Sequence, residues 1–129
     1  MPARILIVED QAIIAQGLSR GLQALGHEVV GVAHNGREGI IAAAELNPEL
    51  VLTDIGLGEG IDGIEMANAI HECKAIPMIF LTACTDPAIL ERAMKTSPYG
   101  YIVKPFEISQ VEATIRVALC RLGEEMKAA

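Results

Sequence analysis

The sequence lacks a long apolar segment of the kind that crosses or anchors in a membrane. Hydrophobic residues make up 51% of the 129 positions, but no uncharged run approaches the ~18 residues that a membrane-spanning helix needs. The opening residues, Met1 to Arg4, are not followed by the apolar core of a secretion signal. We therefore expect a soluble, cytoplasmic protein that is not exported and has no membrane partner.

Cysteines and basic residues are also few and scattered. The three cysteines are too widely spaced for the usual zinc-binding pairs, and an odd number fits poorly with a closed set of disulfides, so we expect reduced, buried side chains at Cys73, Cys84 and Cys120. The ten Lys and Arg residues form no cluster, and the net charge is −7. Because nucleic-acid-binding domains usually present a basic surface, direct binding to nucleic acid is not expected.

Short aliphatic runs alternate with amphipathic segments along the whole chain. The runs predict five strands, at 5–8, 27–33, 50–53, 77–82 and 100–103. Helical spacing of apolar residues, with glycine, asparagine or proline at several ends, predicts helices at 11–25, 39–46, 62–73, 87–95 and 108–122. Five strand-helix units with short connections favour one doubly wound α/β domain, with a five-stranded parallel sheet in the order 2-1-3-4-5 between five helices.

Acidic residues follow two of the strands that this order makes neighbours. Glu9 and Asp10 come directly after the first strand, and Asp54 follows the third. Because ligands of open α/β sheets bind at the carboxyl ends of the strands, these carboxylates should lie within several ångströms of one another. Mutual repulsion would be relieved by a divalent cation with oxygen ligands, which makes Mg²⁺ the expected cofactor. The alternative is that each acid only caps a helix or lies in solvent at a strand end.

A hydroxyl and an ammonium are expected at the same edge of the sheet. Lys104, which precedes Pro105, follows the fifth strand and could pair with Asp54 or contact a phosphoryl oxygen, although a lysine at a strand end is often only a surface charge. Thr82 ends the fourth strand and could donate a hydrogen bond to an oxyanion. Its alternative role is to cap the helix that begins near Pro87.

Together these residues resemble the receiver domains of two-component response regulators, which have a flavodoxin-like fold, and the resemblance covers almost the whole chain. It rests on five features in order: the acidic pair, the aspartate after the third strand, the following Asp62-Gly63 dipeptide, the threonine and the Lys-Pro pair. The resemblance implies that Asp54 accepts a phosphoryl group and that Glu9, Asp10, Asp54 and the backbone carbonyl of Gly56 bind Mg²⁺. It also implies that Thr82 and Lys104 contact the phosphoryl group and that Tyr101 is an aromatic switch. The alternative for Tyr101 is a strand aromatic on a partly exposed face.

The same resemblance implies partners and a mode of action. The phosphoryl donor would be a histidine kinase or a histidine phosphotransfer domain, with Ala12, Ile13 and Gln16 as candidate contacts or, equally, as ordinary core or surface residues. Phosphorylation would change the surface of helix four, strand five and helix five to control an output, with a homodimer formed through that surface. Residues 1–122 would form the receiver, and 123–129 a polar tail or the start of a linker to an output or sensor domain. The chain would be a switch whose only chemistry is its own phosphorylation and dephosphorylation, and not an enzyme acting on other substrates.

The sequence departs from the family in one loop. Most receivers have the dipeptide equivalent to Asp62-Gly63 one residue nearer the acceptor and a proline in between, whereas residues 56–61 are longer and rich in glycine, which favours mobility. Gly56 and Cys84, two positions after Asp54 and Thr82, resemble the family's variable positions that influence hydrolysis of the acyl phosphate.

Three other functions remain open from the residues alone. A phosphatase of the haloacid dehalogenase type would need an acid two residues after Asp54, where Gly56 stands. A flavin carrier would need a hydroxyl- and glycine-rich loop after the first strand, and residues 11–14 do not provide one. A receiver that only docks, without phosphorylation, is disfavoured because all five functional positions are intact.

Overall fold

The computed structural model describes residues 2–83 and 85–128, and these form a five-stranded parallel sheet between two layers of helices. The strand order is β2-β1-β3-β4-β5, as the sequence predicts. The strands are β1 (Arg4–Val8), β2 (Glu28–Ala33), β3 (Leu50–Thr53), β4 (Met78–Thr82) and β5 (Gly100–Val103). The central strands β1, β3 and β4 are almost wholly buried, which explains their continuous aliphatic sequences.

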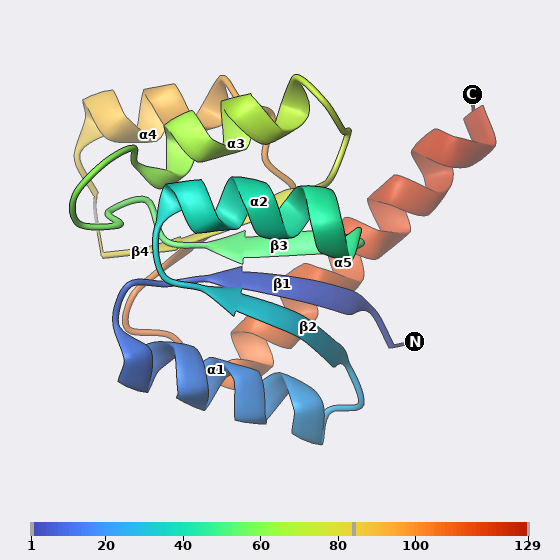
Figure 1. Ribbon diagram of the computed structural model, residues 1–129. Helices are drawn as coiled ribbons and strands as arrows, with labels where there is room; N and C mark the ends of the chain where they lie inside the picture. Colours follow the sequence, from blue (N-terminus) through green and yellow to red (C-terminus); the bar gives the residue numbers. More distant parts are fainter. Residues whose placement is uncertain (1, 84, 129) are drawn as a thin grey trace.

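The helices cover both faces of the sheet. They are α1 (Ala12–Ala24), α2 (Gly36–Leu46), α3 (Gly63–His71), α4 (Pro87–Met94) and α5 (Ile108–Ala128). Figure 1 shows α2, α3 and α4 on one face and α1 and α5 on the other. Each face has its own hydrophobic core, with Phe80 and Met66 buried on the first and Ile7 and Ile115 on the second.

Helix α2 begins earlier than the sequence predicts. The apolar spacing predicts a start at Gly39. Instead the Asn35 side chain accepts a hydrogen bond from the Glu38 N–H at 2.9 Å and caps a helix that starts at Gly36. Gly36 packs so closely against Ile61 that a Cβ there would lie 2.5 Å from Cγ1 of Ile61. The glycine therefore allows α2 to contact the long loop between β3 and α3.

Helix α5 continues past Leu122, where the apolar periodicity weakens, as far as Ala128. Tyr99 explains this extension: its hydroxyl donates to the Glu125 carboxylate, with oxygen distances of 2.5 and 2.9 Å, and the Arg121 guanidinium lies 4.1 Å from its ring centre. Figure 1 shows this end of α5 projecting beyond the strands. The assignment of 123–129 to a tail or linker outside the domain stays a prediction.

The expected burial of the cysteines is wrong for the two that the structure describes. Cys73 and Cys120 are exposed free thiols, because Cys73 follows the end of α3 and Cys120 lies on the outward side of α5. Cys84 lies outside the described residues. Among residues 2–83 and 85–128, no helix is both long and apolar enough to cross a membrane.

Candidate functional site

The sheet brings the expected polar residues to one edge. Glu9 follows β1, Asp54 follows β3, Thr82 ends β4 and Lys104 follows β5. Residues Val8 and Thr53 are paired across β1 and β3, and Thr82 and Val103 are paired across β4 and β5. Since these strands are parallel and in register, the residues after them meet at the carboxyl edge of the sheet.

Lys104 joins two carboxylates at this edge. Its Nζ donates to Oδ2 of Asp54 at 2.7 Å and to Oε1 of Glu9 at 2.8 Å. All three side chains are largely buried: Lys104 is 16% exposed, Asp54 12% and Glu9 4%. The sequence predicts the ion pair with Asp54. It does not predict the second pair, because it places Glu9 and Lys104 at the same edge without indicating which carboxylates the ammonium contacts.

Three carboxylates lie close enough together to hold a cation. Oxygen atoms of Glu9, Asp10 and Asp54 lie within 4.8 Å of one another, with Glu9 buried and Asp10 exposed. Hard oxygen ligands with an exposed side suit Mg²⁺, which keeps several waters when it binds. The N–H of Gly56 donates to Oδ1 of Asp54 at 3.3 Å. These residues therefore fit the cation that the sequence implies, while the role of the Gly56 carbonyl as a ligand stays a prediction.

Helix capping does not account for Asp10. The N-cap of α1 is Gln11, which makes no side-chain capping bond, and the Gln11 N–H donates to Oε2 of Glu9 at 3.2 Å. At β4 the alternative role of Thr82 is taken by Asp86, whose side chain caps α4 by accepting from the Ala88 N–H at 2.8 Å. Thr82 is 3% exposed, and its role at the site stays a prediction.

The pKa values of both Glu9 and Lys104 are raised, but for different physical reasons. Burial raises the pKa of Glu9, and the Lys104 hydrogen bond only partly offsets this. Burial alone would lower the pKa of Lys104, but its hydrogen bonds to Asp54 and Glu9 outweigh burial and raise it. Lys104 therefore keeps its positive charge at neutral pH, where it can neutralise anionic oxygens beside Asp54.

A pocket of about 540 Å³ opens over Asp54. Its walls come from the ends of the strands, the β3–α3 loop, and helices α1 and α4. The lining residues are Gln11, Ile14, Asp54, Ile55, Gly56, Asp62, Thr82, Ala83, Ile89 and Lys104. The pocket has room for a phosphoryl-sized group on the Asp54 carboxylate, and a donor can approach from solvent.

The loop that follows Asp54 is tightly joined to the start of α3. The Gly63 N–H donates to the Ile55 carbonyl at 2.7 Å, and a Cβ on Gly63 would lie 2.1 Å from the Asp54 carbonyl oxygen. Asp62 caps α3 through a reciprocal pair of hydrogen bonds with Glu65. The Asp62-Gly63 dipeptide therefore fixes α3 against the backbone of Asp54. Although the loop was expected to be mobile, its Leu57 is 2% exposed and anchors it in the core.

Tyr101 lies two residues into β5, on the side of the sheet that α4 covers. Its ring is partly buried and meets Phe80 edge to face, with ring centres 6.4 Å apart at an interplanar angle of 62°. Such pairs are favourable contacts between aromatic rings. This geometry places the Tyr101 ring against the core beside β4, and its role as a switch stays a prediction.

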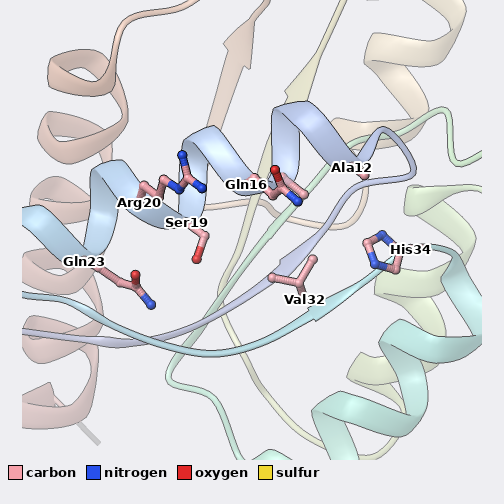
Figure 2. A pocket seen from close by; sticks show the side chains of 8 residues that line it. Ala12, Gln16, Ser19, Arg20, Gln23, Val32 and His34 are labelled. Carbon is pink, nitrogen blue, oxygen red and sulfur yellow. The ribbon is translucent and has the colours of Figure 1, made fainter.

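A second hollow lies away from the acids, between α1 and the edge strand β2. Its volume is about 390 Å³, and Figure 2 shows Gln16, Ser19 and Gln23 on α1 facing Val32 and His34. Ala12 and Arg20 complete the labelled lining. Among the described residues, none of those lining this hollow has a carboxylate side chain, in contrast to the edge that carries Glu9, Asp10 and Asp54.

Comparison with known proteins gives one consistent family. The profile of the response regulator receiver domain matches residues 5–116. The transcriptional regulatory protein PdtaR of Mycobacterium tuberculosis is 36% identical over 96% of this chain and 60% of that protein. The phyllosphere-induced regulator PhyR of Methylorubrum extorquens is 37% identical over 92% of this chain and 44% of its own length. The chain thus spans about half of these curated relatives.

Solved structures agree with the fold. The signal receiver domain of a modulated diguanylate cyclase from Desulfovibrio desulfuricans superposes with a TM-score of 0.91 at 34% identity, covering 97% of this chain and 99% of that one. The response regulator PhyR from Brucella abortus gives 0.85 at 34% identity, covering 99% of this chain and 52% of that one. The likeness therefore extends over the whole chain in both cases.

Proposed function

Because this chain belongs to the family of response regulator receiver domains, we propose that Asp54 is its phosphoacceptor and that phosphorylation switches the surface used to control an output. The observation that carries the proposal is the contact of Lys104 with Asp54 and Glu9, at 2.7 and 2.8 Å, inside a cluster of three carboxylates. A single ammonium held between two carboxylates can neutralise transferring oxygens, as phosphoryl transfer requires. The switch would operate in the cytoplasm as a non-enzymatic signalling protein.

The chemistry needs one nucleophile and one donor. A carboxylate oxygen of Asp54 attacks the phosphorus of a phosphohistidine, the P–N bond breaks, and the histidine nitrogen leaves with the bonding electron pair. The product is an acyl phosphate on Asp54, and water later returns the carboxylate and inorganic phosphate. Lys104 stays positively charged throughout and supplies a hydrogen-bond donor on one side of the transferring group.

The acids beside Asp54 have a separate role in this proposal. Glu9, Asp10, Asp54 and the carbonyl of Gly56 would hold Mg²⁺. When bound there, the cation would neutralise charge on the phosphoryl oxygens. Glu9 also orients the Lys104 ammonium, and burial keeps both in place. Thr82, which lines the same pocket, would donate its hydroxyl hydrogen to an oxygen of the bound phosphoryl group.

The switch would run through the neighbouring strand. Phosphorylation adds negative charge and acceptor oxygens beside Thr82. Movement of Thr82 toward these oxygens would change the space available to Tyr101. The Tyr101 ring packs against Phe80, which lies on β4 together with Thr82. Identical Tyr101 ring positions in the protein with and without a phosphoryl analogue would contradict this step.

Two surfaces are proposed for partners. A histidine kinase or histidine phosphotransfer domain would contact the start of α1, where Ile13 is 84% exposed and where Ala12 and Gln16 border the hollow of Figure 2. The output surface would be α4, β5 and α5. The curated relatives are longer than this chain, which supports an output or sensor domain linked to the receiver in the intact protein.

The first prediction tests Asp54 directly by incubation with acetyl phosphate and Mg²⁺, followed by intact mass. We expect a gain of one phosphoryl group in the wild type and none in Asp54→Asn. The matched control is Asp86→Asn, which makes the same chemical change at the cap of α4, where asparagine caps equally well. It should be phosphorylated like the wild type.

The outcomes separate the competing functions. No gain in the wild type would contradict the proposal and favour a receiver that only docks. A phosphoryl gain that persists in Asp54→Asn would show that another residue is the acceptor. Hydrolysis of a phosphate ester well beyond one equivalent would favour the phosphatase, although position 56 offers a backbone N–H and no carboxyl group to Asp54.

A further inference from the structure

Arg92 of α4 forms an ion pair with the wall of the acceptor pocket. Its Nη2 lies 3.1 Å from Oδ2 of Asp62, and Asp62 lines the pocket with Asp54, Thr82 and Lys104. The other carboxylate oxygen of Asp62 accepts from the Glu65 N–H at 2.8 Å to cap α3. The two oxygens of Asp62 thus have separate partners, one on its own helix and one on α4.

This contact connects a rigid part of the site to a weakly held helix. Asp62 precedes Gly63, which packs directly against the Asp54 carbonyl, so the Asp62 carboxylate cannot shift far from the acceptor. Helix α4, in contrast, buries only Ala93 fully, with Ile89 partly buried at the pocket wall. The Arg92–Asp62 pair therefore ties α4 to the loop that carries Asp54.

The pair also changes the charge that a phosphoryl donor meets. Glu9, Asp10 and Asp54 already place three carboxylates at the site, and Lys104 is paired with two of them. Asp62 adds a fourth negative charge to the wall of the same pocket, beside α4. An anionic donor approaching Asp54 would be repelled by that charge if it were not compensated.

From this arrangement we infer that Arg92 is a positioning residue for phosphorylation, which acts by neutralising the charge of Asp62 at the rim of the pocket. The inference rests on the proposed function of Asp54 and extends it to a residue on α4. It acts through Asp62, and Arg92 itself contacts no reacting atom. Loss of Arg92 should therefore lower the rate of phosphorylation by an anionic donor. The same loss should raise the affinity of the site for Mg²⁺.

The test compares rates of phosphorylation by acetyl phosphate at fixed Mg²⁺, read by intact mass over time. Arg92→Gln should be slower by roughly three- to tenfold at low ionic strength, with the difference shrinking as salt screens the charge of Asp62. Arg92→Lys should recover most of the rate. The matched control is Lys95→Gln, which removes a positive charge from the end of the same helix outside the pocket lining, and it should react at about the wild-type rate.

A double variant shows whether Arg92 acts through Asp62. Asp62→Asn removes the charge but keeps an equally good helix cap, so the double variant Asp62→Asn with Arg92→Gln should return to about the wild-type rate. Titration calorimetry should also show tighter Mg²⁺ binding to Arg92→Gln than to the wild type. A loss of folding would not produce this pair of opposite effects.

These experiments distinguish a failure of the proposed role of Asp54 from a failure of the proposed role of Arg92. If the wild type gains no phosphoryl group, the proposed function of Asp54 fails. If the wild type is phosphorylated but Arg92→Gln and Lys95→Gln react alike, the role of Arg92 is wrong while Asp54 remains the acceptor. If the double variant stays as slow as Arg92→Gln, the effect of Arg92 does not pass through Asp62, and the inference is overturned.

Discussion

Lys104 compensates two carboxylates that the fold holds at short distance in a largely buried site. Removing one partner of such a group leaves the others charged without compensation, which costs more than the loss of a surface ion pair. We therefore predict that Lys104→Met lowers the free energy of unfolding by roughly 3 kcal/mol at pH 7 without Mg²⁺. Urea unfolding monitored by circular dichroism measures this change.

Mg²⁺ should reverse part of that loss. Without the ammonium, Glu9 and Asp54 repel each other more strongly, so added Mg²⁺ should stabilise Lys104→Met more than it stabilises the wild type. Lys95→Met, a change at an exposed position at the end of α4, should alter stability by less than about 0.5 kcal/mol. Equal Mg²⁺ effects in Lys104→Met and the wild type would contradict the view that the ammonium and the cation compensate the same carboxylates.

Single-residue positions at strand ends are predictable, whereas contacts between elements are less so. The sequence places Asp54 and Lys104 at one edge, because parallel strands end together. It does not indicate that Arg92 forms an ion pair with Asp62, or that Lys104 pairs with Glu9 as well as with Asp54. Both contacts depend on how helices and loops pack. The only signal for the first was the Asp62-Gly63 dipeptide, which marks the start of α3 but not its partner on α4.

At the scale of elements, a buried histidine joins the start of β2 to α5. Nδ1 of His27 accepts from the Ala3 N–H at 3.0 Å, so the hydrogen of the neutral ring lies on Nε2, which donates to Glu112 at 2.6 Å. Burial alone would raise the pKa of Glu112, but the hydrogen bonds from His27 and Arg116 outweigh it and lower that pKa. The contact connects three segments far apart in the sequence.

The sign of the pH effect follows from that shift. A carboxyl group whose pKa is lower in the folded protein adds stability above its ordinary value of 4.5, and the added stability is lost as pH falls below it. We predict that Glu112→Gln lowers the free energy of unfolding by roughly 1 kcal/mol at pH 7, as for one lost hydrogen bond. The difference from the wild type should shrink below about pH 4.5.

Urea unfolding at a series of pH values tests this prediction. Glu28→Gln is the matched control, because Glu28 is an exposed glutamate whose carboxylate lies 3.8 Å from Arg4. Its difference from the wild type should stay below about 0.5 kcal/mol at every pH. A Glu112→Gln difference that is constant or grows toward low pH would refute the assigned role of the carboxylate.

The ends of helices can be predicted from the sequence only where interactions between neighbouring residues determine them. The end of α5 depends on Tyr99, which precedes β5 and bonds to Glu125, so helical spacing alone predicts an end at Leu122. The start of α2 depends on whether Asn35 caps or breaks the helix, and its bond to the Glu38 N–H decides for capping. The order 2-1-3-4-5, which five strand-helix units with right-handed crossovers favour, is confirmed by the structure.

At the scale of the whole molecule, an acidic chain carries exposed apolar side chains on α4, β5 and α5. The net charge of −7 opposes self-association at low salt. Exposed apolar side chains nevertheless occur on α4, at the end of β5 and at the start of α5, namely Leu90, Met94, Val103 and Ile108. Leu90, Met94 and Val103 define the α4/β5/α5 face, which adjoins the pocket through α4, whereas Ile108 packs beside Gly21 of α1.

We predict that this face forms a homodimer when Asp54 carries a phosphoryl analogue. Sedimentation velocity with Mg²⁺ and beryllium fluoride should show the wild type shifting from monomer toward dimer, because a rearranged α4 brings its apolar side chains together with those of β5 and α5. Leu90→Glu should remain monomeric, since a carboxylate at the centre of such an interface would be desolvated without a partner. Ile13→Glu, the same kind of change at an exposed residue of α1, should dimerise like the wild type. If Ile13→Glu blocks the dimer and Leu90→Glu does not, the association surface is α1, and the α4/β5/α5 face must serve a different partner.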